Sequence, residues 1–336
     1  MIPSMPLLSQ TPPKFGPALL NDLANLDLIS HPLVENFLYE QTATMLMADP
    51  GVGKSVLAMQ LALSLANGEP LFGVLPVPKR QPVYYLQLEG SYYKAIQRLR
   101  LMQQHLPIVT GLNEGLCWDR LDLLNVLNAT HVTSLVERIA SWGTPAVIIF
   151  DPIYRSVMGG LSKDEVASQF CAVSDRLMQQ FHCANLLVHH THRSQFLDGK
   201  KLQEDDPFYG SQWLKAHVDV SYLVTPLTAE RNRVVLECKK NRDLDVLPRI
   251  VLDFDPHTYT CLMNPEESQA SAMSKLILFL TELKKSGQKQ TDVYHIEGCI
   301  NVSLAHLKRL MKIHPIPDMV NFVKISGSTT KWVLKE

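Results

Sequence analysis

A single loop limits the folds open to this chain: Ala48-Asp49-Pro50-Gly51-Val52-Gly53-Lys54-Ser55. The apolar stretch Thr44–Met47 precedes it, and Val56 begins a run with apolar residues at helical spacing. This strand–loop–helix context is typical of a phosphate-binding loop, whose glycines let backbone N–H groups turn toward phosphate at a helix N-terminus. Lys54 is expected to reach the β- and γ-phosphates, and the Ser55 hydroxyl to ligate Mg²⁺. Although Ala48 replaces the usual first glycine, residues 48–56 predict binding of a nucleoside triphosphate, ATP.

Apolar strands alternate with helical segments between about residues 40 and 260, a pattern that favours an α/β fold with a mainly parallel sheet covered by helices. The expected strands are Thr44–Ala48, Val83–Gln87, Ala146–Phe150, Asn185–His189, Val218–Val224 and Val234–Cys238. The expected helices span residues 54–67, 91–104, 131–142 and 164–182. We expect this core to occupy residues 35–264, after an N-terminal arm of residues 1–34.

The residue pattern changes after the core. Residues 265–272 are interpreted as a linker and 273–336 as a small winged-helix-like domain. Its expected elements are helices at Met273–Lys285 and Leu304–Lys312 and a two-stranded wing at Phe322–Ile325 and Lys331–Leu334.

The C-terminal segment is basic. From Ala270 onward there are ten Lys and Arg residues against five Asp and Glu, although the whole chain has a net charge of −1. This balance is compatible with a nucleic-acid partner, whose candidate contacts on the second helix are Lys308, Arg309 and Lys312. A module that docks a replication or recombination protein would have the same pattern, so both interpretations stay open.

The composition excludes several other classes. With 46% hydrophobic and 19% charged residues, the chain resembles an ordinary globular protein. It lacks a basic N-terminal region followed by an unbroken apolar run, and it lacks a run of about 18 apolar residues. We therefore expect neither a secretory signal nor a membrane span. The six cysteines form no CxxC pair and are interpreted as buried thiols of a reducing compartment, so the expected location is the cytoplasm.

Two carboxylates are expected beside the loop. The apolar strand Val147–Phe150 ends in Asp151, the Walker B pattern, which we place after the third strand, holding Mg²⁺ through water beside Ser55. The strand that follows the loop helix delivers Glu89 to the same edge, because the carboxyl ends of parallel strands meet there. Glu89 is the candidate base or water-positioning group for hydrolysis. The alternative is a loop carboxylate without a catalytic role.

Three histidines, His189, His190 and His192, end another expected strand. A metal site is disfavoured because successive strand residues point to opposite faces and no carboxylate stands at ligand spacing. We interpret His190 as a hydrogen-bonding sensor of the γ-phosphate. The polar loop 193–212 that follows is long enough to be functional, and it contains Arg193, Lys200 and Lys201.

The order of motifs along the chain resembles that of the RecA-type ATPases. These motifs are the loop, Glu89, Asp151-Pro152-Ile153, His189-His190 and Gly210-Ser211. Within them the chain is most similar to the RepA-like replicative helicases of plasmids and related phage and mobile-element ATPases, over roughly residues 30 to 250. The resemblance implies a homo-oligomer, a hexameric ring, with ATP and Mg²⁺ at the subunit interfaces. It also implies that the loops after Asp151 and His190 grip single-stranded DNA in a central channel, with Arg155 among the contacts.

The resemblance extends to the end of a late strand. Lys240 and Arg242 match a Lys-x-Arg element that reaches the γ-phosphate of the neighbouring subunit, with Arg242 as an arginine finger in trans. The alternative is a solvated basic turn. The aromatic residues near the expected channel are Tyr154, Phe196, Phe208 and Tyr209, which leaves base stacking open.

These features predict a helicase-like ATPase that couples ATP hydrolysis to translocation or unwinding in DNA replication. A recombination or repair ATPase that forms filaments, or a loader that remodels a partner, would have nearly identical motifs. A small-molecule kinase would instead work as a monomer with an arginine-bearing lid. The Lys240/Arg242 element and the basic C-terminal segment count against a kinase.

Overall fold

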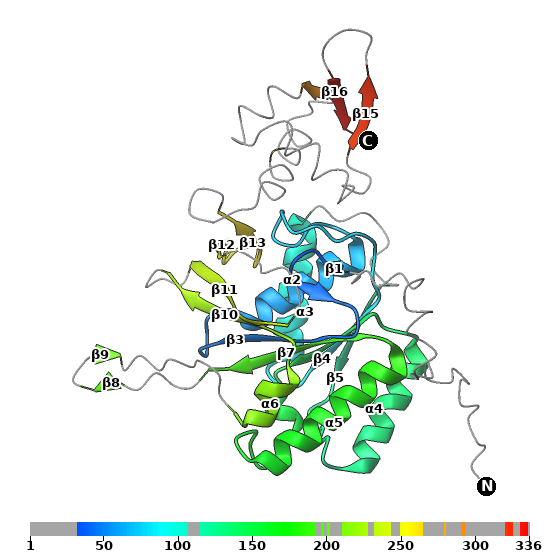
Figure 1. The fold of residues 1–336 in the computed structure, drawn as a ribbon, viewed down its shortest axis with the longest axis vertical. Coiled ribbons are helices and arrows are strands. Elements are labelled where there is room, and N and C mark those ends of the chain that lie inside the picture. The colour runs from blue at the N-terminus through cyan, green and yellow to red at the C-terminus, as the bar shows by residue number, and fades with distance from the viewer. Residues whose placement is uncertain are drawn as a thin grey trace, which may run out of the picture. The chain divides into compact units, whose positions relative to one another are not determined.

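The computed structural model describes residues 32–106, 115–191, 210–227, 232–242 and 249–264, position 279, and short strands at 196–197, 200–201, 290–292, 320–324 and 330–334 (Figure 1). The expected N-terminal arm up to residue 31, the linker and both expected C-terminal helices lie outside these residues. Within the described part, no helix combines the length and hydropathy that a membrane span requires.

A nine-stranded sheet forms the centre of the core, in the order β13-β12-β11-β10-β3-β7-β6-β4-β5. Six strands run parallel: β3 (Ala43–Ala48), β4 (Val83–Gln87), β5 (Leu116–Arg120), β6 (Val147–Asp151), β7 (Ala184–His190) and β10 (Val220–Pro226). Three antiparallel strands extend one edge: β11 (Arg233–Asn241), β12 (Ile250–Phe254) and β13 (Cys261–Met263). The predicted α/β core with a mainly parallel sheet is confirmed.

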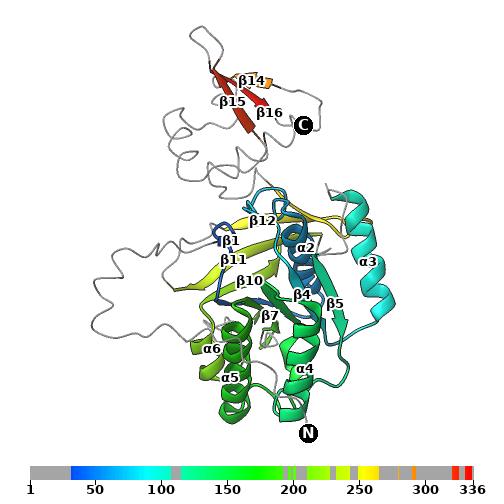
Figure 2. The ribbon, with the colours of Figure 1, turned by 90° about the vertical axis from the view of Figure 1, so that its right-hand side faces the viewer.

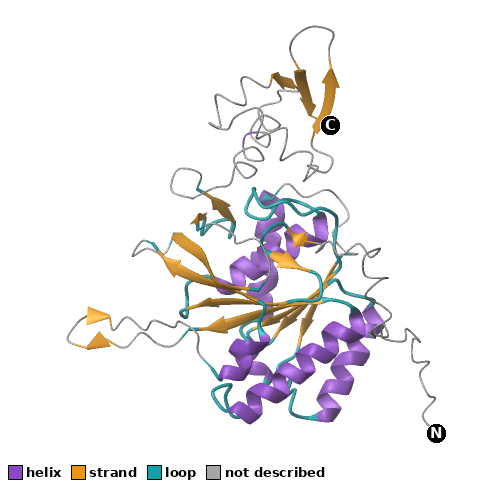
Figure 3. Ribbon diagram, viewed as in Figure 1, coloured by secondary structure: helices purple, strands orange, loops and turns teal. Residues whose placement is uncertain are grey.

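Helices cover both faces of the sheet (Figures 2 and 3). On one face lie α2 (Lys54–Asn67) and α3 (Tyr92–His105), and on the other α4 (Ala129–Trp142), α5 (Asp164–Phe181) and α6 (Gln212–His217). The alternation of strand side chains divides the apolar core accordingly. In β3, for example, Leu46 packs with the α2 side while Met45 and Met47 pack with the α5 side.

Local signals begin and end these helices near the predicted residues. The side chains of Ser91 and Asn128 accept hydrogen bonds from backbone N–H groups in the first turns of α3 and α4. Gly68 ends α2 in the left-handed conformation, with φ of 68°. Because such capping acts within a few residues, it can be read from the sequence.

The structure corrects two sequence-based expectations. Strand β5 was not predicted, so Asp151 ends the fourth strand of the central sheet along the chain, not the third. The edge position of β5 leaves most of its residues half-buried, and the sequence Leu-Cys-Trp-Asp-Arg therefore lacks an apolar run. The cysteines also differ, because Cys117 and Cys238 are only half-buried whereas Cys171, Cys183 and Cys261 are buried.

Shorter elements complete the described chain. Strands β1 (Pro32–Val34) and β2 (Leu38–Tyr39) form a hairpin, and β8 (Phe196–Leu197) pairs with β9 (Lys200–Lys201). Leu33 and Val34, which the sequence places in the arm, are fully buried in the same apolar cluster as α2.

Near the C-terminus, β15 (Val320–Lys324) and β16 (Thr330–Leu334) pair antiparallel at the predicted wing, and β14 (Gln290–Asp292) joins β16 on its other side. The strand β14 was not predicted. The winged-helix form itself stays a prediction.

Gln60 connects α2 to the edge strand β13, and its removal is expected to destabilise the core. Its buried amide donates to the Cys261 carbonyl at 2.8 Å and accepts from the Cys261 N–H at 2.7 Å. Gln60→Ala leaves both backbone groups unpaired and should lower the free energy of unfolding by roughly 2–5 kcal/mol. Urea unfolding is the measurement, and Gln104→Ala on the exposed side of α3 is the control, expected within about 0.5 kcal/mol of wild type. Equal unfolding midpoints for the two variants would contradict this account.

Candidate functional site

The predicted phosphate-binding loop joins the end of β3 to the start of α2. Its glycines adopt positive φ angles, 78° at Gly51 and 104° at Gly53, and Gly53 is the N-cap of α2. A Cβ atom on Gly53 would meet nothing within 4 Å, so it is the backbone conformation that requires glycine. Ala48, by contrast, is the last residue of β3, and extended backbone suits any residue. The missing first glycine therefore causes no strain.

Lys54 folds back over its own loop. Its Nζ donates to the carbonyl oxygens of Ala48 at 2.7 Å and Asp49 at 2.9 Å, and the side chain is buried. Burial lowers the pKa of Lys54 to about 8, against the opposing attraction of three nearby carboxylates, of which Asp151 contributes most. The ammonium group is thus held on neutral acceptors that a charged phosphate would displace.

Asp151, the last residue of β6, is 5% exposed and contacts two hydroxyl donors. Ser55 Oγ donates to Oδ1 at 3.0 Å and Tyr85 OH donates to Oδ2 at 2.6 Å. Burial raises the pKa of Asp151, and these two hydrogen bonds oppose that rise. The structure therefore brings together Ser55 and Asp151, as the sequence predicted, and adds Tyr85, which the sequence analysis did not single out.

Glu89 lies just beyond β4 at the same edge of the sheet, where the backbone N–H of Leu88 donates to the Asp151 carbonyl at 2.8 Å. Its Oε2 accepts a hydrogen bond from Tyr154 OH and a longer one, 3.4 Å, from Arg155 Nε. Both donors belong to the 3-10 helix η2 (Ile153–Ser156), which follows Asp151 directly. The candidate base therefore contacts a residue that was predicted to bind nucleic acid.

His190 is the last residue of β7 and pairs in register with Ala48. Its ring centroid lies 5.1 Å from that of Tyr154, and its buried Nδ1 has no hydrogen-bond partner among the described residues. Burial lowers the pKa of His190, which favours the neutral ring. The next residue, Thr191, donates through Oγ1 to the Asp49 carboxylate, so the end of β7 is tied to the loop.

A cavity of about 440 Å³ opens beside the loop. Its lining consists of residues 51–57 with Glu89, Arg98, Asp151, Pro152, His190, Val234, Phe254, Tyr259 and Cys261. Arg98 on α3 places its guanidinium carbon 5.4 Å from the ring centroid of Tyr259, which lies between β12 and β13. Sequence reasoning missed both residues, because 161 positions separate them and no local pattern marks either one.

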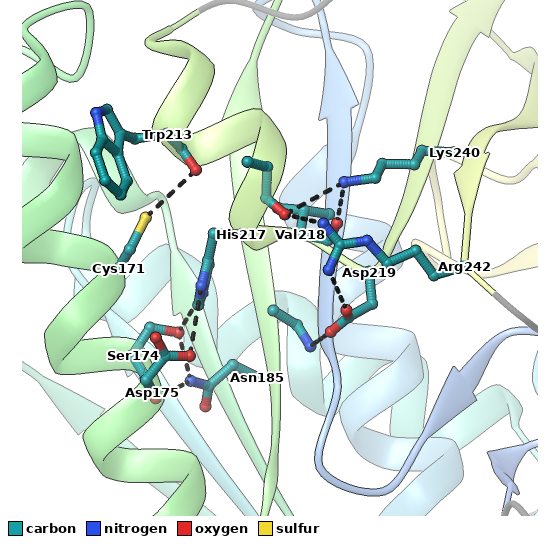
Figure 4. Close-up of polar contacts among 12 residues, drawn as sticks. Cys171, Ser174, Asp175, Asn185, Trp213, His217, Val218, Asp219, Lys240 and Arg242 are labelled. Carbon is teal, nitrogen blue, oxygen red and sulfur yellow. Dashed lines mark hydrogen bonds and ion pairs between the residues drawn. The ribbon is translucent and has the colours of Figure 1, made fainter.

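Lys240 in β11 and Arg242 just beyond it converge on the C-terminal end of α6 (Figure 4). Lys240 Nζ donates to the carbonyl oxygens of Lys215 at 2.6 Å and Val218 at 2.5 Å. Arg242 donates to the carbonyl oxygen of Ala216 and lies 3.4 Å from the carboxylate of Asp219. The C-terminus of a helix carries partial negative charge, which suits cations. Within one chain, both predicted trans residues are therefore engaged.

His217 ends α6, and its buried side chain joins a polar network with α5 and β7 (Figure 4). Its Nε2 lies 3.0 Å from Ser174 Oγ and its Nδ1 3.5 Å from a carboxylate oxygen of Asp175, both on α5. Asn185, a buried residue of β7, donates to the same Ser174 Oγ at 2.8 Å. Burial lowers the pKa of His217, against the opposing attraction of Asp175. The helix α6 is thus bonded both to α5 and to the basic end of β11.

The predicted nucleic-acid contacts are only partly within the described chain. The Arg155 side chain is 57% exposed beside Glu89. Lys200 and Lys201 form β9, and their side chains are not described. Arg193, Phe208, Tyr209, Lys308, Arg309 and Lys312 lie outside the described residues. Trp213, at the start of α6, is 57% exposed, and the sequence analysis did not consider it.

Comparisons with known proteins concern the family and the fold of the chain. A family model described as "AAA domain" matches residues 10–195. The fold is similar to a solved structure described as an "ATPase Domain", with 13% identity, a TM-score of 0.50, and coverage of 73% of this chain and 95% of that one. It is also similar to a "DnaB-Like Replicative Helicase" solved with regard to "Its Interactions With Primase", with 13% identity, a TM-score of 0.52, and coverage of 73% and 66%. At this identity the two structures concern the fold alone. Curated proteins give no significant match.

The depressed pKa of His217 predicts that acidification weakens the fold. The unfolded chain takes up a proton on this ring near pH 6.5, whereas the folded chain takes it up only at lower pH. The stability that His217 contributes is thus complete above about pH 6.5 and is lost as pH falls through the folded pKa. His217→Gln should flatten the dependence of the unfolding free energy on pH, while His257→Gln, at an exposed position, should not. Urea unfolding between pH 7.5 and 5 measures this, and parallel curves for wild type and His217→Gln would contradict it.

Proposed function

The chain belongs to the AAA domain family and has a RecA-type ATPase fold, and from this premise we propose an oligomeric, ring-forming ATPase that binds single-stranded DNA. ATP hydrolysis would drive translocation or unwinding in DNA replication. One observation carries the proposal: Lys54, the Ser55–Asp151 pair and Glu89 line one cavity at one edge of the sheet. The likeness of the fold to a DnaB-like replicative helicase supports the helicase-type assignment.

The residues present fit a magnesium ion. The Ser55 hydroxyl and the Asp151 carboxylate offer the hard oxygen donors that Mg²⁺ prefers, 3.0 Å apart, at the N-terminus of α2. Ser55 would hold the ion directly and Asp151 would hold it through water. When bound, Mg²⁺ would offset the negative charge of the β- and γ-phosphates.

Three side chains would then act on ATP. Lys54 would exchange the carbonyl oxygens of its own loop for phosphate oxygens, a stronger charge-assisted contact. Glu89 would orient and deprotonate the attacking water, and His190, with its unpartnered Nδ1, would register the γ-phosphate. The planar guanidinium of Arg98 and the ring of Tyr259 are proposed to hold the base, since both groups line the cavity and lie next to each other.

Lys240 and Arg242 are proposed to complete the site of a neighbouring subunit. Neither residue lines the nucleotide cavity of its own chain. Each now donates to carbonyl oxygens at the end of α6, and a γ-phosphate offers more negative charge than those acceptors. Assembly would therefore move both cations from α6 to the adjacent nucleotide.

Nucleic acid is proposed to bind at η2 and at the loop that precedes α6. Arg155 would contact phosphate, and the exposed Trp213 offers a ring for stacking. The Ser211 N–H donates to the Leu161 carbonyl at 2.9 Å, so the start of α6 contacts the segment between η2 and α5. The same proposal includes the domain limits. These are a core at 35–264, a linker at 265–272 and a winged-helix-like domain at 273–336 that binds DNA or a replication protein.

The ATPase rate measured against protein concentration, with and without single-stranded DNA, tests the function. A shared site predicts turnover per chain that rises steeply with concentration and again with DNA. Glu89→Gln should keep nucleotide affinity and lose about 10²–10⁴ in turnover, whereas Lys54→Ala should lose binding as well. A flat rate that ignores DNA would overturn the proposal in favour of a self-contained site such as that of a kinase.

Mixed oligomers test the trans assignment. Arg242→Ala should bind nucleotide normally and lose about 10³-fold or more in turnover. Mixing it with inactive Lys54→Ala should restore activity, because some interfaces then join an intact loop to an intact Arg242. Lys239→Ala is the matched control on the same strand, since Lys239 pairs with Glu237 at 2.8 Å and should not affect turnover. Subunit exchange without recovery would contradict the assignment.

A further inference from the structure

Two adjacent tyrosines on β4 each donate a hydrogen bond to an aspartate, on opposite faces of the sheet. Tyr84 OH donates to Asp119 Oδ2 at 2.6 Å within the α4–α5 side of the core. Tyr85 OH donates to Asp151 Oδ2, also at 2.6 Å, on the α2 side. The two bonds have the same chemistry and length, but only that of Tyr85 reaches the candidate nucleotide site.

Tyr85 has little freedom to move. It is fully buried and stacks on Trp118 of β5, with ring centroids 4.0 Å apart and planes inclined by 11°. The parallel register of β4 and β5 places these two residues side by side. A fully buried, stacked phenol holds its hydroxyl in one direction, which here is toward Asp151.

We propose that Tyr85 is a positioning residue that sets which oxygen of Asp151 faces the Mg²⁺–nucleotide complex. The inference rests on the proposed function. With Oδ2 engaged by Tyr85, Oδ1 is the oxygen directed at Ser55. Without the phenol hydroxyl, the buried carboxylate loses one of its two side-chain donors and the restraint on its rotation. Hydrogen-bond partners that orient metal-binding groups typically change metal affinity by 10–100-fold.

Trp118 extends this arrangement to the second carboxylate. Its Nε1 donates to Gln87 Oε1 at 2.9 Å, and Gln87 Nε2 donates to the Glu89 carbonyl at 3.0 Å. Tyr85 and Gln87 are two residues apart in β4 and so share one face of the strand, and Glu89 follows two residues later. One indole thus supports the tyrosine that holds Asp151 and the glutamine that holds the backbone at Glu89.

The Mg²⁺ dependence of nucleotide binding tests the proposal. A fluorescent ATP analogue is titrated into full-length protein at increasing Mg²⁺ and, separately, in EDTA. Tyr85→Phe should raise the half-saturating Mg²⁺ concentration about tenfold and leave the affinity in EDTA unchanged. Tyr84→Phe is the matched control and should behave like wild type in both titrations. It is expected to fold, because Asp119 keeps hydrogen bonds of 2.8 and 2.5 Å from Arg138.

A wild-type Mg²⁺ response in folded Tyr85→Phe would overturn the proposal, as would an equal shift in Tyr84→Phe. If Tyr85→Phe does not fold, Trp118→Leu replaces it, because this change removes the stacking partner and keeps the Tyr85 hydroxyl. A raised half-saturating Mg²⁺ concentration would then support the proposal, and a wild-type value would overturn it. If wild-type protein itself binds nucleotide without regard to Mg²⁺, it is the proposed function that fails.

Discussion

The hydrogen bond from Ser55 to Asp151 joins the first turn of α2 to the end of β6. The geometry of the candidate nucleotide site depends on this bond. The carboxylate is almost completely buried, so its charged form depends on its donors, of which Tyr85 is the second. The same strand end accepts a backbone hydrogen bond from Leu88, which places Glu89 next to Asp151. One set of contacts among α2, β4 and β6 therefore positions the loop, the proposed metal-binding carboxylate Asp151 and the candidate base Glu89.

The three cations proposed to act on ATP donate hydrogen bonds to backbone carbonyl groups. Lys54 donates to its own loop, and Lys240 and Arg242 donate to the end of α6. These carbonyl acceptors are neutral, so a phosphate would offer each cation a stronger charge-assisted contact, although Arg242 also pairs with the Asp219 carboxylate at 3.4 Å. Because α6 would lose this capping when the two cations move to a neighbour, assembly would also loosen the helix that ends in His217. In the sequence, α6 follows the loop after His190, which is part of the proposed nucleic-acid site. The chain itself thus connects the proposed subunit interface to the proposed nucleic-acid site.

What the sequence could predict depended on how local each signal is. The loop, its helix and the Asp151 strand were predicted because glycines, caps and an apolar run lie within a few residues of one another. The edge strand β5 has no such run, and the short helix α6 falls between the predicted loop 193–212 and the next expected strand, so the partners of Lys240 and Arg242 could not be anticipated. The pairing of Arg98 with Tyr259, like the bond from Tyr85 to Asp151, exists only once strand order and register are known.

The contacts of Glu89 suggest why an ATPase of this design would respond to nucleic acid. Its carboxylate accepts from Tyr154 and Arg155, two neighbours on η2. A base that is occupied by a phenol and a guanidinium is poorly placed to take a proton from water. If Arg155 turns to a nucleic-acid phosphate, Glu89 loses its cationic partner and can contact water instead, while Tyr154 stays packed against His190. Coupling between the two ligands would then require no long pathway, since the one turn η2 contacts Glu89 and is also the proposed nucleic-acid site.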